Sequence, residues 1–500
     1  MTLARLLSRG QRGLDAYEVI VEVHRANGLP AFRIAGLPEA AVRESKDRVR
    51  AALEASNVKV PASKITVHLG PADIPKEGGR FDLAIAIGLA ETIREAAWKT
   101  GGYEFLGELG LNGELRPIRG AVPAVLAARD AGRTTILPYA NAPEAALIGD
   151  AHVLRADSLL EVIEHLDGYR SLQCVCSADW PSAAPPPAFD LADVNGHAWP
   201  KRALIVAAAG GHHVLLSGPP GTGKSMLAQR LPGLLPPMSP EEALKVISIE
   251  SVAGEPLDLE QALRRPYRAP HHSASVAALV GGGSHPRPGE ISLAHLGVLF
   301  LDELPEFRRS ALEALREPLQ NGKISIARAA GTVSFPARFQ LVAAMNPCPC
   351  GHLGDHTDRC RCSPNVVQQY RAKLSGPLLD RFDIHVEVPR QPFDVGRRLN
   401  APGETIEAAA RVRDARAIQF ARSSALNAQL EPRELRRIAE LEPSSRRLLA
   451  HAAERWNLSL RSCNRITKVA RSIADLAGEP EILPLHTAEA IQLRCLDRPL

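Results

Sequence analysis

The chain has 500 residues, of which 45% are hydrophobic and 23% charged, and this composition excludes a disordered or fibrous protein. Such a length exceeds one hydrophobic core, so two to four domains are expected, and a net charge of +4 is too small to indicate a partner. The N-terminus lacks the apolar region of a signal peptide, and no run reaches about 18 apolar residues, so we expect a cytoplasmic protein that makes no membrane contact.

The first part of the chain, residues 1–168, mixes strand-like and helical patterns. Tyr17–Val23 and Ile65–Leu69 have the composition of strands, and Val122–Ala131 has that of a helix. This mixture predicts an α+β domain. Residues 169–189 include the proline-rich string SADWPSAAPPP and are predicted to be a linker.

A central region, residues 190–390, alternates short apolar runs with helical stretches, which predicts a doubly wound parallel sheet. The run at 214–216 leads into a complete G-x-x-x-x-G-K-[ST] phosphate-binding loop. Its residues are Gly218, Pro219, Pro220, Gly221, Thr222, Gly223, Lys224 and Ser225. Backbone N–H groups of such a loop surround phosphate, with Lys224 neutralising charge and Ser225 holding Mg²⁺. The predicted ligands are therefore ATP and Mg²⁺.

Two further apolar runs end in polar residues. Val298–Leu301 is followed by Asp302, expected to bind Mg²⁺, and by Glu303, expected to polarise an attacking water. The run ending at Met345 is followed by Asn346, whose neutral amide could hydrogen-bond the water or the γ-phosphate. An apolar run with two acids is common by itself, but after a phosphate-binding loop it predicts ATP hydrolysis.

An arginine precedes the next apolar run, Ile384–Val388. Arg381 is a candidate arginine finger, which stabilises transition-state charge on the ATP of a neighbouring subunit and so implies a ring. The alternative is a surface salt bridge between Arg381 and Asp380 or Asp383.

Residues 391–500 have an almost purely helical pattern and are predicted to form a helical lid domain. One apolar stripe is expected there, with Arg465, Lys468 and Asp475 off it. Its members are Ile466, Val469, Ala470, Ile473 and Ala477.

Four cysteines crowd into a predicted insert at 346–363. The thiolates of Cys348, Cys350, Cys360 and Cys362 suit tetrahedral Zn²⁺. The C-x-C spacing is tighter than usual, so His352 or His356 could replace one ligand. The alternative is a loop of four reduced thiols. No role is assigned to the other four cysteines.

Three longer strings carry a family resemblance: RPYRAPHHSAS at 265–275, GGGSHPRPGEISLAHLGVLFLDELPEF, and ARFQLVAAMNPCPCG. Together they resemble the ComM/YifB group of helix-2-insert AAA+ proteins, often described as magnesium-chelatase-like. The resemblance covers the whole chain. It implies a homohexamer whose pore is lined by a helix-2 insert, containing the first string, and by a presensor-1 hairpin at Lys323–Pro336. It also implies that Asn346 is sensor 1, and that Arg461, early in a lid helix, is sensor 2.

DNA contacts are predicted in these two inserts. Around Gly331, alternating apolar residues independently indicate a hairpin that would carry Arg328 to a phosphate backbone. The other candidates are Arg268, His271 and His272. An equal alternative for all four is a solvated face or structural histidines.

The first domain resembles the proteolytic domain of Lon through the strings at 71–82 and 107–117. The position of the Lon nucleophilic serine holds Arg80, and that of the general-base lysine holds Val122. This pair excludes a serine–lysine protease. The resemblance instead implies a platform for ring assembly or DNA handling.

The resemblance implies an ATP-driven DNA helicase that catalyses branch migration of recombination intermediates during natural transformation. The alternative is a chelatase-type motor that remodels a protein partner so that a metal enters a tetrapyrrole. The Lon-like domain and the paired C-x-C motifs favour the first function.

Overall fold

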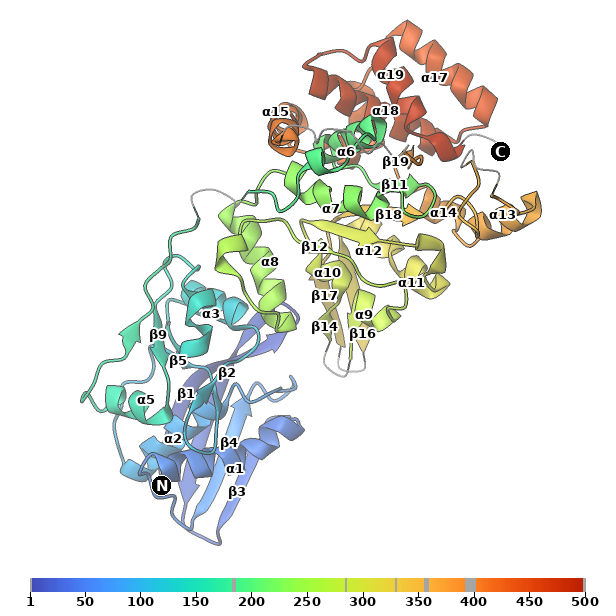
Figure 1. The fold of residues 1–500 in the computed structure, drawn as a ribbon. Coiled ribbons are helices and arrows are strands. Elements are labelled where there is room, and N and C mark those ends of the chain that lie inside the picture. The colour runs from blue at the N-terminus through green and yellow to red at the C-terminus, as the bar shows by residue number, and fades with distance from the viewer. Residues whose placement is uncertain are drawn as a thin grey trace.

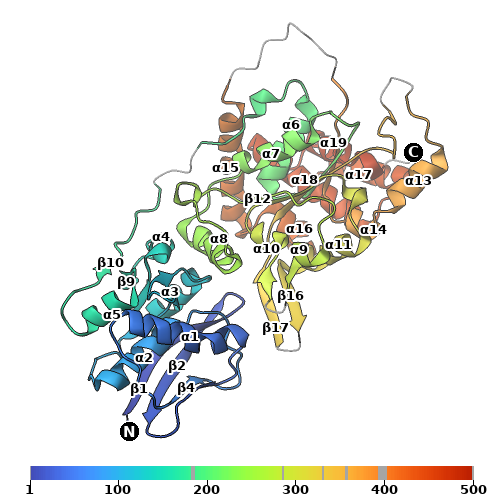
Figure 2. The same cartoon turned by 60° about the horizontal axis from the view of Figure 1, so that its bottom comes forward.

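Two large sheets and a C-terminal group of helices organise the chain (Figures 1 and 2). The computed structural model describes residues 2–181, 186–283, 286–328, 331–354, 359–391 and 402–497. The predicted mixture of α and β structure is confirmed. Among the described residues, no helix is both long and apolar enough to cross a bilayer.

The N-terminal sheet has eight strands in the order β10-β9-β8-β5-β1-β2-β4-β3. Their bounds are β1 Thr2–Arg12, β2 Asp15–Ala26, β3 Ala31–Ala35, β4 Lys64–Gly70, β5 Tyr103–Phe105, β8 Thr134–Pro138, β9 Val153–Ala156 and β10 Gln173–Cys174. Helices α1 (Ala40–Ala55), α2 (Asp82–Arg94), α3 (Ala121–Asp130), α4 (Ala142–Ala145) and α5 (Leu159–Leu166) accompany them, with a small pair β6 (Glu108–Leu109) and β7 (Leu115–Arg116). β10 lies within residues 169–189, which the sequence predicts to be a linker. Its backbone pairs with β9, so the N-terminal sheet extends to Cys174.

The central sheet has five parallel strands in the order β12-β15-β18-β11-β19. Their bounds are β11 Val214–Ser217, β12 Tyr267–Arg268, β15 Val298–Leu301, β18 Gln340–Met345 and β19 Ile384–Glu387. The residues of β11, β15 and β18 are all buried, as expected for parallel strands covered on both faces. The helices of this region are α6 Ala198–Gly210, α7 Lys224–Leu234, α8 Pro240–Ala253, α9 Val276–Val280, α10 Glu290–Leu293, α11 Arg309–Ala314, α12 Arg316–Asn321, α13 Pro364–Ala372 and α14 Gly376–Leu379.

The predicted helix-2 insert, which contains the string at 265–275, is wrong for Tyr267 and Arg268, because these residues form a strand of the central sheet. Tyr267 and Arg268 pair with Val298 and Leu299 and form the edge strand of the sheet. Tyr267 also stacks on Phe300 of the neighbouring strand, with ring centroids 6.2 Å apart. Between α9 and α10 lies instead a short antiparallel pair, β13 (Gly281–Gly282) and β14 (Arg287–Pro288).

The predicted hairpin is present. β16 (Lys323–Arg328) and β17 (Gly331–Pro336) pair in antiparallel register. Ile326 and Phe335 are buried in the core cluster below the sheet. A Cβ added to Gly281 would lie 3.1 Å from Ile326 Cδ1, so the two hairpins lie side by side. Both views show the β16–β17 hairpin on the side away from the C-terminal helices (Figures 1 and 2).

The N-terminal region packs against the central region at two places. Val122 and Val125 of α3 share a buried cluster with Val246 and Ile247 of α8. The turn between β1 and β2 reaches the hairpin, where a Cβ on Gly13 would lie 2.5 Å from Val333 Cγ1. Arg12 Nη2 donates to the carbonyl oxygen of Thr332 at 3.4 Å.

The C-terminal region is helical, as predicted. Its helices are α15 Glu404–Ser423, α16 Pro432–Ile438, α17 Pro443–Trp456, α18 Leu460–Ala477 and α19 Pro484–Gln492. They share one hydrophobic cluster with α6 and α7.

The predicted apolar stripe of α18 is confirmed at its centre, but the prediction is wrong at the C-terminal end of the helix. Ile466 and Ile473 are buried as predicted, but Ala477 is exposed and Asp475 is buried. Asp475 is buried because Arg471 Nε and Arg422 Nη1 both donate to its Oδ1, at 3.0 and 2.8 Å.

Candidate nucleotide-hydrolysis site

The phosphate-binding loop joins β11 to the first turn of α7. Gly221 and Gly223 have φ of 75° and 84°, a region that residues with a Cβ rarely adopt. The loop can therefore turn its N–H groups inward at the start of a helix, where the helix dipole favours an anion.

The ammonium of Lys224 closes this loop. Its Nζ donates to the carbonyl oxygens of Gly218 and Pro219, both at 2.8 Å, and to Asn346 Oδ1 at 3.2 Å. Burial lowers the pKa of Lys224, while the charges of Asp302 and Glu303 oppose that shift. All three acceptors are neutral, so phosphate oxygens would be better partners for this cation.

Asp302 and Ser225 meet across the ends of β15 and α7. Ser225 Oγ donates to Asp302 Oδ2 at 2.6 Å, and Asp302 Oδ1 accepts the N–H of Glu303 at 2.9 Å. A hydroxyl and a carboxylate in contact beside a phosphate-binding loop are the hard oxygen donors that Mg²⁺ prefers, so the residues fit this ion.

Glu303 has a left-handed backbone, at φ 54°, and its carboxylate is 52% exposed. Glu303 Oε2 lies 3.0 Å from Nδ1 of His272. The neighbouring ring of His271 lies 4.1 Å away and contacts Ser273 Oγ through Nδ1 at 2.8 Å. The structure therefore brings His272, predicted as a DNA contact, to the carboxylate predicted to polarise the attacking water.

A cavity of about 410 Å³ opens beside these groups and is lined by Glu303, Asn346, Pro349 and Tyr370. Asn346, at the end of β18, and Tyr370 of α13 thus face the same cavity. A larger cavity, about 760 Å³, lies among α7, α8 and α15, away from the phosphate-binding loop.

Arg381 lies at the opposite edge of the sheet from this loop. It precedes β19, which runs parallel to β11 with Ile384 beside Val214, whereas the loop follows the other end of β11. A four-residue strand is about 13 Å long, so this distance at least separates the two edges.

A group of arginines surrounds Arg381. Burial, and then the charges of Arg465, Arg461 and Arg316, lower the pKa of Arg381. Its Nη2 donates to Gln320 Oε1 at 3.1 Å. Asp383, weighed above as a partner of Arg381, binds Arg465 Nη1 at 2.7 Å instead.

The structure gives different outcomes for the other two DNA-contact candidates, Arg268 and Arg328. Arg268 is engaged within the chain, since its Nε donates to Glu290 Oε2 at 2.7 Å, and this arrangement favours the structural alternative for it. The backbone of Arg328 ends β16, and its side chain is outside the described part of the structure.

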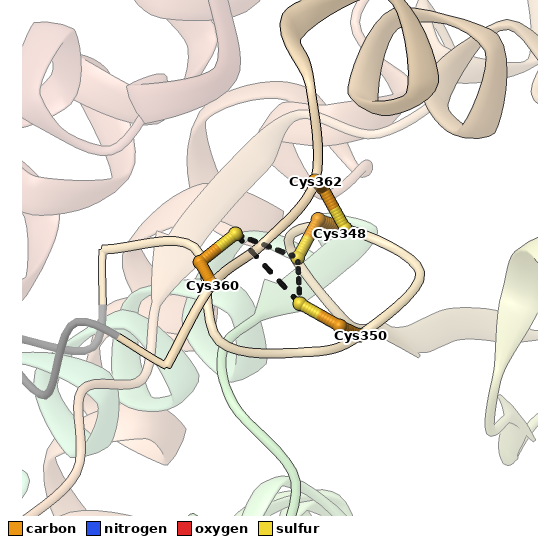
Figure 3. A group of neighbouring side chains, drawn as sticks. All are labelled: Cys348, Cys350, Cys360 and Cys362. Carbon is orange, nitrogen blue, oxygen red and sulfur yellow. Dashed lines mark hydrogen bonds between the residues drawn. The ribbon is translucent and has the colours of Figure 1, made fainter.

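The four cysteines converge on one point (Figure 3). Their sulfur atoms all lie within 4.8 Å of one another, with Cys348 to Cys350 at 3.3 Å, Cys348 to Cys360 at 3.8 Å and Cys350 to Cys360 at 3.7 Å. Four sulfurs at about 2.3 Å from a tetrahedral Zn²⁺ would be about 3.8 Å apart, so the group could hold this ion. The N–H of His352 donates to Cys350 Sγ, while His356 lies outside the described residues.

Comparisons with known proteins agree with this arrangement. The family model "Magnesium chelatase, subunit ChlI" matches residues 190–395, and related models match 21–141 and 403–494. The chain is 48% identical to "Competence protein ComM" of Haemophilus influenzae, over 100% of this chain and 99% of that protein.

Two further relatives set the range of similarity. The chain is 46% identical to "Uncharacterized protein YifB" of Escherichia coli, covering 100% of this chain and 98% of that one. It is 25% identical to a "Maternal DNA replication licensing factor" of Xenopus tropicalis, over 41% of this chain and 25% of that protein. With full-length identity of this size and three matching domain models, the chain belongs to the ComM/YifB family of magnesium-chelatase-like AAA+ proteins.

Proposed function

We propose that this protein is a ring-forming ATPase that uses ATP hydrolysis to translocate DNA, acting as a branch-migration helicase on recombination intermediates. The observation that carries the catalytic half of the proposal is the convergence of Lys224, Ser225, Asp302, Glu303 and Asn346 at one edge of the sheet. The DNA half draws on the relatives, which are named as a competence protein and as DNA replication licensing factors.

The chain's own residues divide the work of hydrolysis. Lys224 exchanges its carbonyl partners for phosphate oxygens, and Ser225 with Asp302 holds Mg²⁺. When bound, this ion supplies positive charge beside the phosphates. Glu303 polarises the attacking water within the cavity, and Asn346 positions that water without adding negative charge.

The positions of Arg381 and Arg461 favour a ring. Arg381 lies at the amino edge of the sheet, opposite the phosphate-binding loop of its own chain, and the charge of Arg461 acts on it. A second copy placed edge to edge would receive them, as in a head-to-tail closed ring. We therefore assign both residues to the neighbouring subunit's site, and a homohexamer is our proposal for the ring.

The hairpin connects the catalytic edge to DNA. Only three residues, Ala337 to Phe339, separate β17 from β18, and β18 leads directly to Asn346. Movement of Asn346 upon hydrolysis would therefore shift the hairpin, whose tip is predicted to carry Arg328 to a phosphate backbone.

We also propose that the four cysteines hold a structural Zn²⁺. All four positions offer thiolate ligands, and the separations from Cys360 Sγ to the sulfurs of Cys348 and Cys350, 3.8 and 3.7 Å, are close to those of a tetrahedral site.

Steady-state ATPase measurements with and without a synthetic four-way DNA junction test the function. We expect strong stimulation by the junction that declines as salt rises, and no hydrolysis by Lys224→Ala or Glu303→Gln. An active ATPase that is indifferent to DNA would contradict the DNA motor and favour the alternative, a chelatase-type motor that remodels a protein partner.

A further inference from the structure

The cysteine-bearing loop begins and ends at elements of the nucleotide site. Cys348 is fully buried and lies two residues after Asn346, at the end of β18. Cys362 lies two residues before Pro364, the first residue of α13. A single ion bound by the four thiolates would therefore tie the end of the sensor strand to the start of α13.

This loop also rests on the phosphate-binding loop. Gly351 has φ 82°, and a Cβ added to it would lie 2.7 Å from Pro220 Cδ, 3.2 Å from Pro220 Cγ and 3.9 Å from Asn346 Cγ. Since real Cβ atoms do not approach other atoms at 2.7 Å, only glycine allows this contact between the two loops.

The same loop forms part of the cavity in which hydrolysis would occur. Pro349, between the first two cysteines, lines this cavity together with Glu303 and Asn346. α13 contributes Tyr370 to the same cavity. The described residues of the segment from Cys348 to Tyr370, 348–354 and 359–370, thus contact the phosphate-binding loop, the sensor asparagine and the catalytic cavity.

We propose that this segment is a zinc clip whose metal occupancy sets the affinity of the chain for nucleotide. This inference rests on the proposed nucleotide site and deepens it. With zinc bound, Gly351 and Pro349 are pinned against Pro220 and Asn346. Without zinc, four thiols within 4.8 Å lose the ion that orders them, and both contacts to the nucleotide site are released.

The test uses the full-length chain and two readouts: zinc content per chain and the dissociation constant of a fluorescent ADP analogue. We expect one zinc per chain. Cys350→Ser, which changes an exposed ligand, and chelator-treated wild type should lose zinc and bind ADP at least about tenfold more weakly, with recovery of the treated wild type on adding Zn²⁺. The double substitution Cys174→Ser, Cys176→Ser alters an exposed C-x-C pair near β10 and should leave both readouts unchanged.

A second variant separates the clip from general folding. Gly351→Val keeps all four thiolates but cannot approach Pro220, so it should retain zinc and still lose ADP affinity. The proposal is overturned if wild type contains no zinc, if the zinc-free chain binds ADP like wild type, or if Gly351→Val does.

The results that would reject the proposed function differ from those that would reject the zinc clip. Zinc-dependent ADP binding without stimulation of ATPase by DNA would leave the clip standing and reject the DNA motor. An absence of ADP binding by the zinc-loaded chain would reject the nucleotide site itself.

Discussion

Glu303 is held in a left-handed backbone conformation directly after the buried strand β15. For a residue with a side chain, this conformation costs on the order of 1 kcal/mol, and such strain is retained where the surrounding structure fixes it. Here it turns the carboxylate away from Asp302 and toward the cavity shared with Asn346, where His272 meets it. The two neighbouring acids can therefore have separate roles, one binding Mg²⁺ and the other acting on water.

If Glu303 polarises the attacking water as proposed, His272 would compete with that water for its carboxylate. We expect His272→Ala to raise the DNA-independent ATPase rate, because the carboxylate loses a partner 3.0 Å away. The two side chains are 34% and 52% exposed, so the contact contributes at most about 1 kcal/mol, or roughly fivefold in rate. Steady-state ATPase measurements without DNA would detect the change.

The neighbouring histidine provides the control for this prediction. His271→Ala retains the contact between His272 and Glu303 and should remain near the wild-type rate. A lower rate in His272→Ala at unchanged nucleotide affinity would show instead that His272 orients Glu303 for catalysis.

Among the strands and helices, the sequence predicts those whose pattern depends only on residues that are neighbours in the chain. β11, β15 and β18 are continuous apolar runs because parallel strands are buried on both faces, and each leads into its polar site residues. β12 has two residues and no apolar run, so only its pairing with β15 reveals it. The stripe of α18 fails at Asp475 because this carboxylate pairs with Arg422 of α15 as well as with Arg471 of its own helix, and the contact with α15 has no local signal.

Some parts of the candidate site can likewise be predicted from local sequence, and others cannot. The phosphate-binding loop and the strand-end carboxylates follow from short motifs. The contact of His272 with Glu303 and the packing of Gly351 on Pro220 join segments that are far apart in the chain, and neither has a local signal. The opposite placement of Arg381 follows only from the direction of β19 relative to β11.

The first turn of α15 depends on Asp190. Its carboxylate accepts the N–H groups of Gly403 at 2.5 Å and Thr405 at 2.9 Å, and the Thr405 hydroxyl at 3.0 Å. Burial would raise the pKa of Asp190, but these hydrogen bonds and one from Ala192 outweigh it and lower the pKa to about 2. The C-terminal helical region is therefore fastened to the start of the central region.

We expect Asp190→Ala to destabilise the protein by about 1–2 kcal/mol, seen as a lower melting temperature at pH 7. Since the folded-state pKa is lowered from 3.8 to about 2, the stabilisation is present above pH 4 and is lost as pH falls toward 2. The charge-dependent part is about 1 kcal/mol for this partly exposed group.

The difference in melting temperature between wild type and Asp190→Ala should therefore narrow below about pH 4. Asp179→Ala, which removes an exposed carboxylate from the linker, should melt like wild type. Equal melting of Asp190→Ala and wild type at pH 7 would contradict the anchoring role.

At the scale of the whole molecule, the N-terminal region contacts the hairpin that is predicted to bind DNA. Gly13, in the turn between β1 and β2, lies against Val333, and Leu14 packs on the cluster that buries the hairpin. The hairpin is thus fixed from one side by the N-terminal region and from the other by β18. This arrangement is consistent with the predicted platform role of the first domain.

We expect Gly13→Val to displace the hairpin and to lower DNA-stimulated ATPase while the basal rate persists, because the new side chain would collide with Val333. Gly132→Val is the matched control, since Gly132 also has a positive φ of 68° but has nothing within 4 Å of the position of a Cβ. Equal DNA stimulation in the two variants would contradict this coupling.

If Arg381 of one copy acts on the ATP bound by Lys224 of the next, two variants that are inactive alone should complement each other. Lys224→Ala and Arg381→Ala should each be inactive, but their equimolar mixture should recover ATPase activity. In a randomly mixed ring, about a quarter of sites would combine an intact Lys224 from one chain with an intact Arg381 from the next. No recovery in mixtures that are shown to form mixed rings would mean that Arg381 does not act on a neighbour's ATP.

The proposed motor function is the movement of branched DNA by ATP hydrolysis at Glu303. Its most direct test is strand exchange in a labelled, mobile four-way junction incubated with the purified chain. We expect the labelled arms to separate only with hydrolysable ATP and Mg²⁺, and Glu303→Gln to bind the junction without separating its arms. Separation that proceeds equally with Glu303→Gln, or junctions left intact by a chain that is hydrolysing ATP, would contradict it.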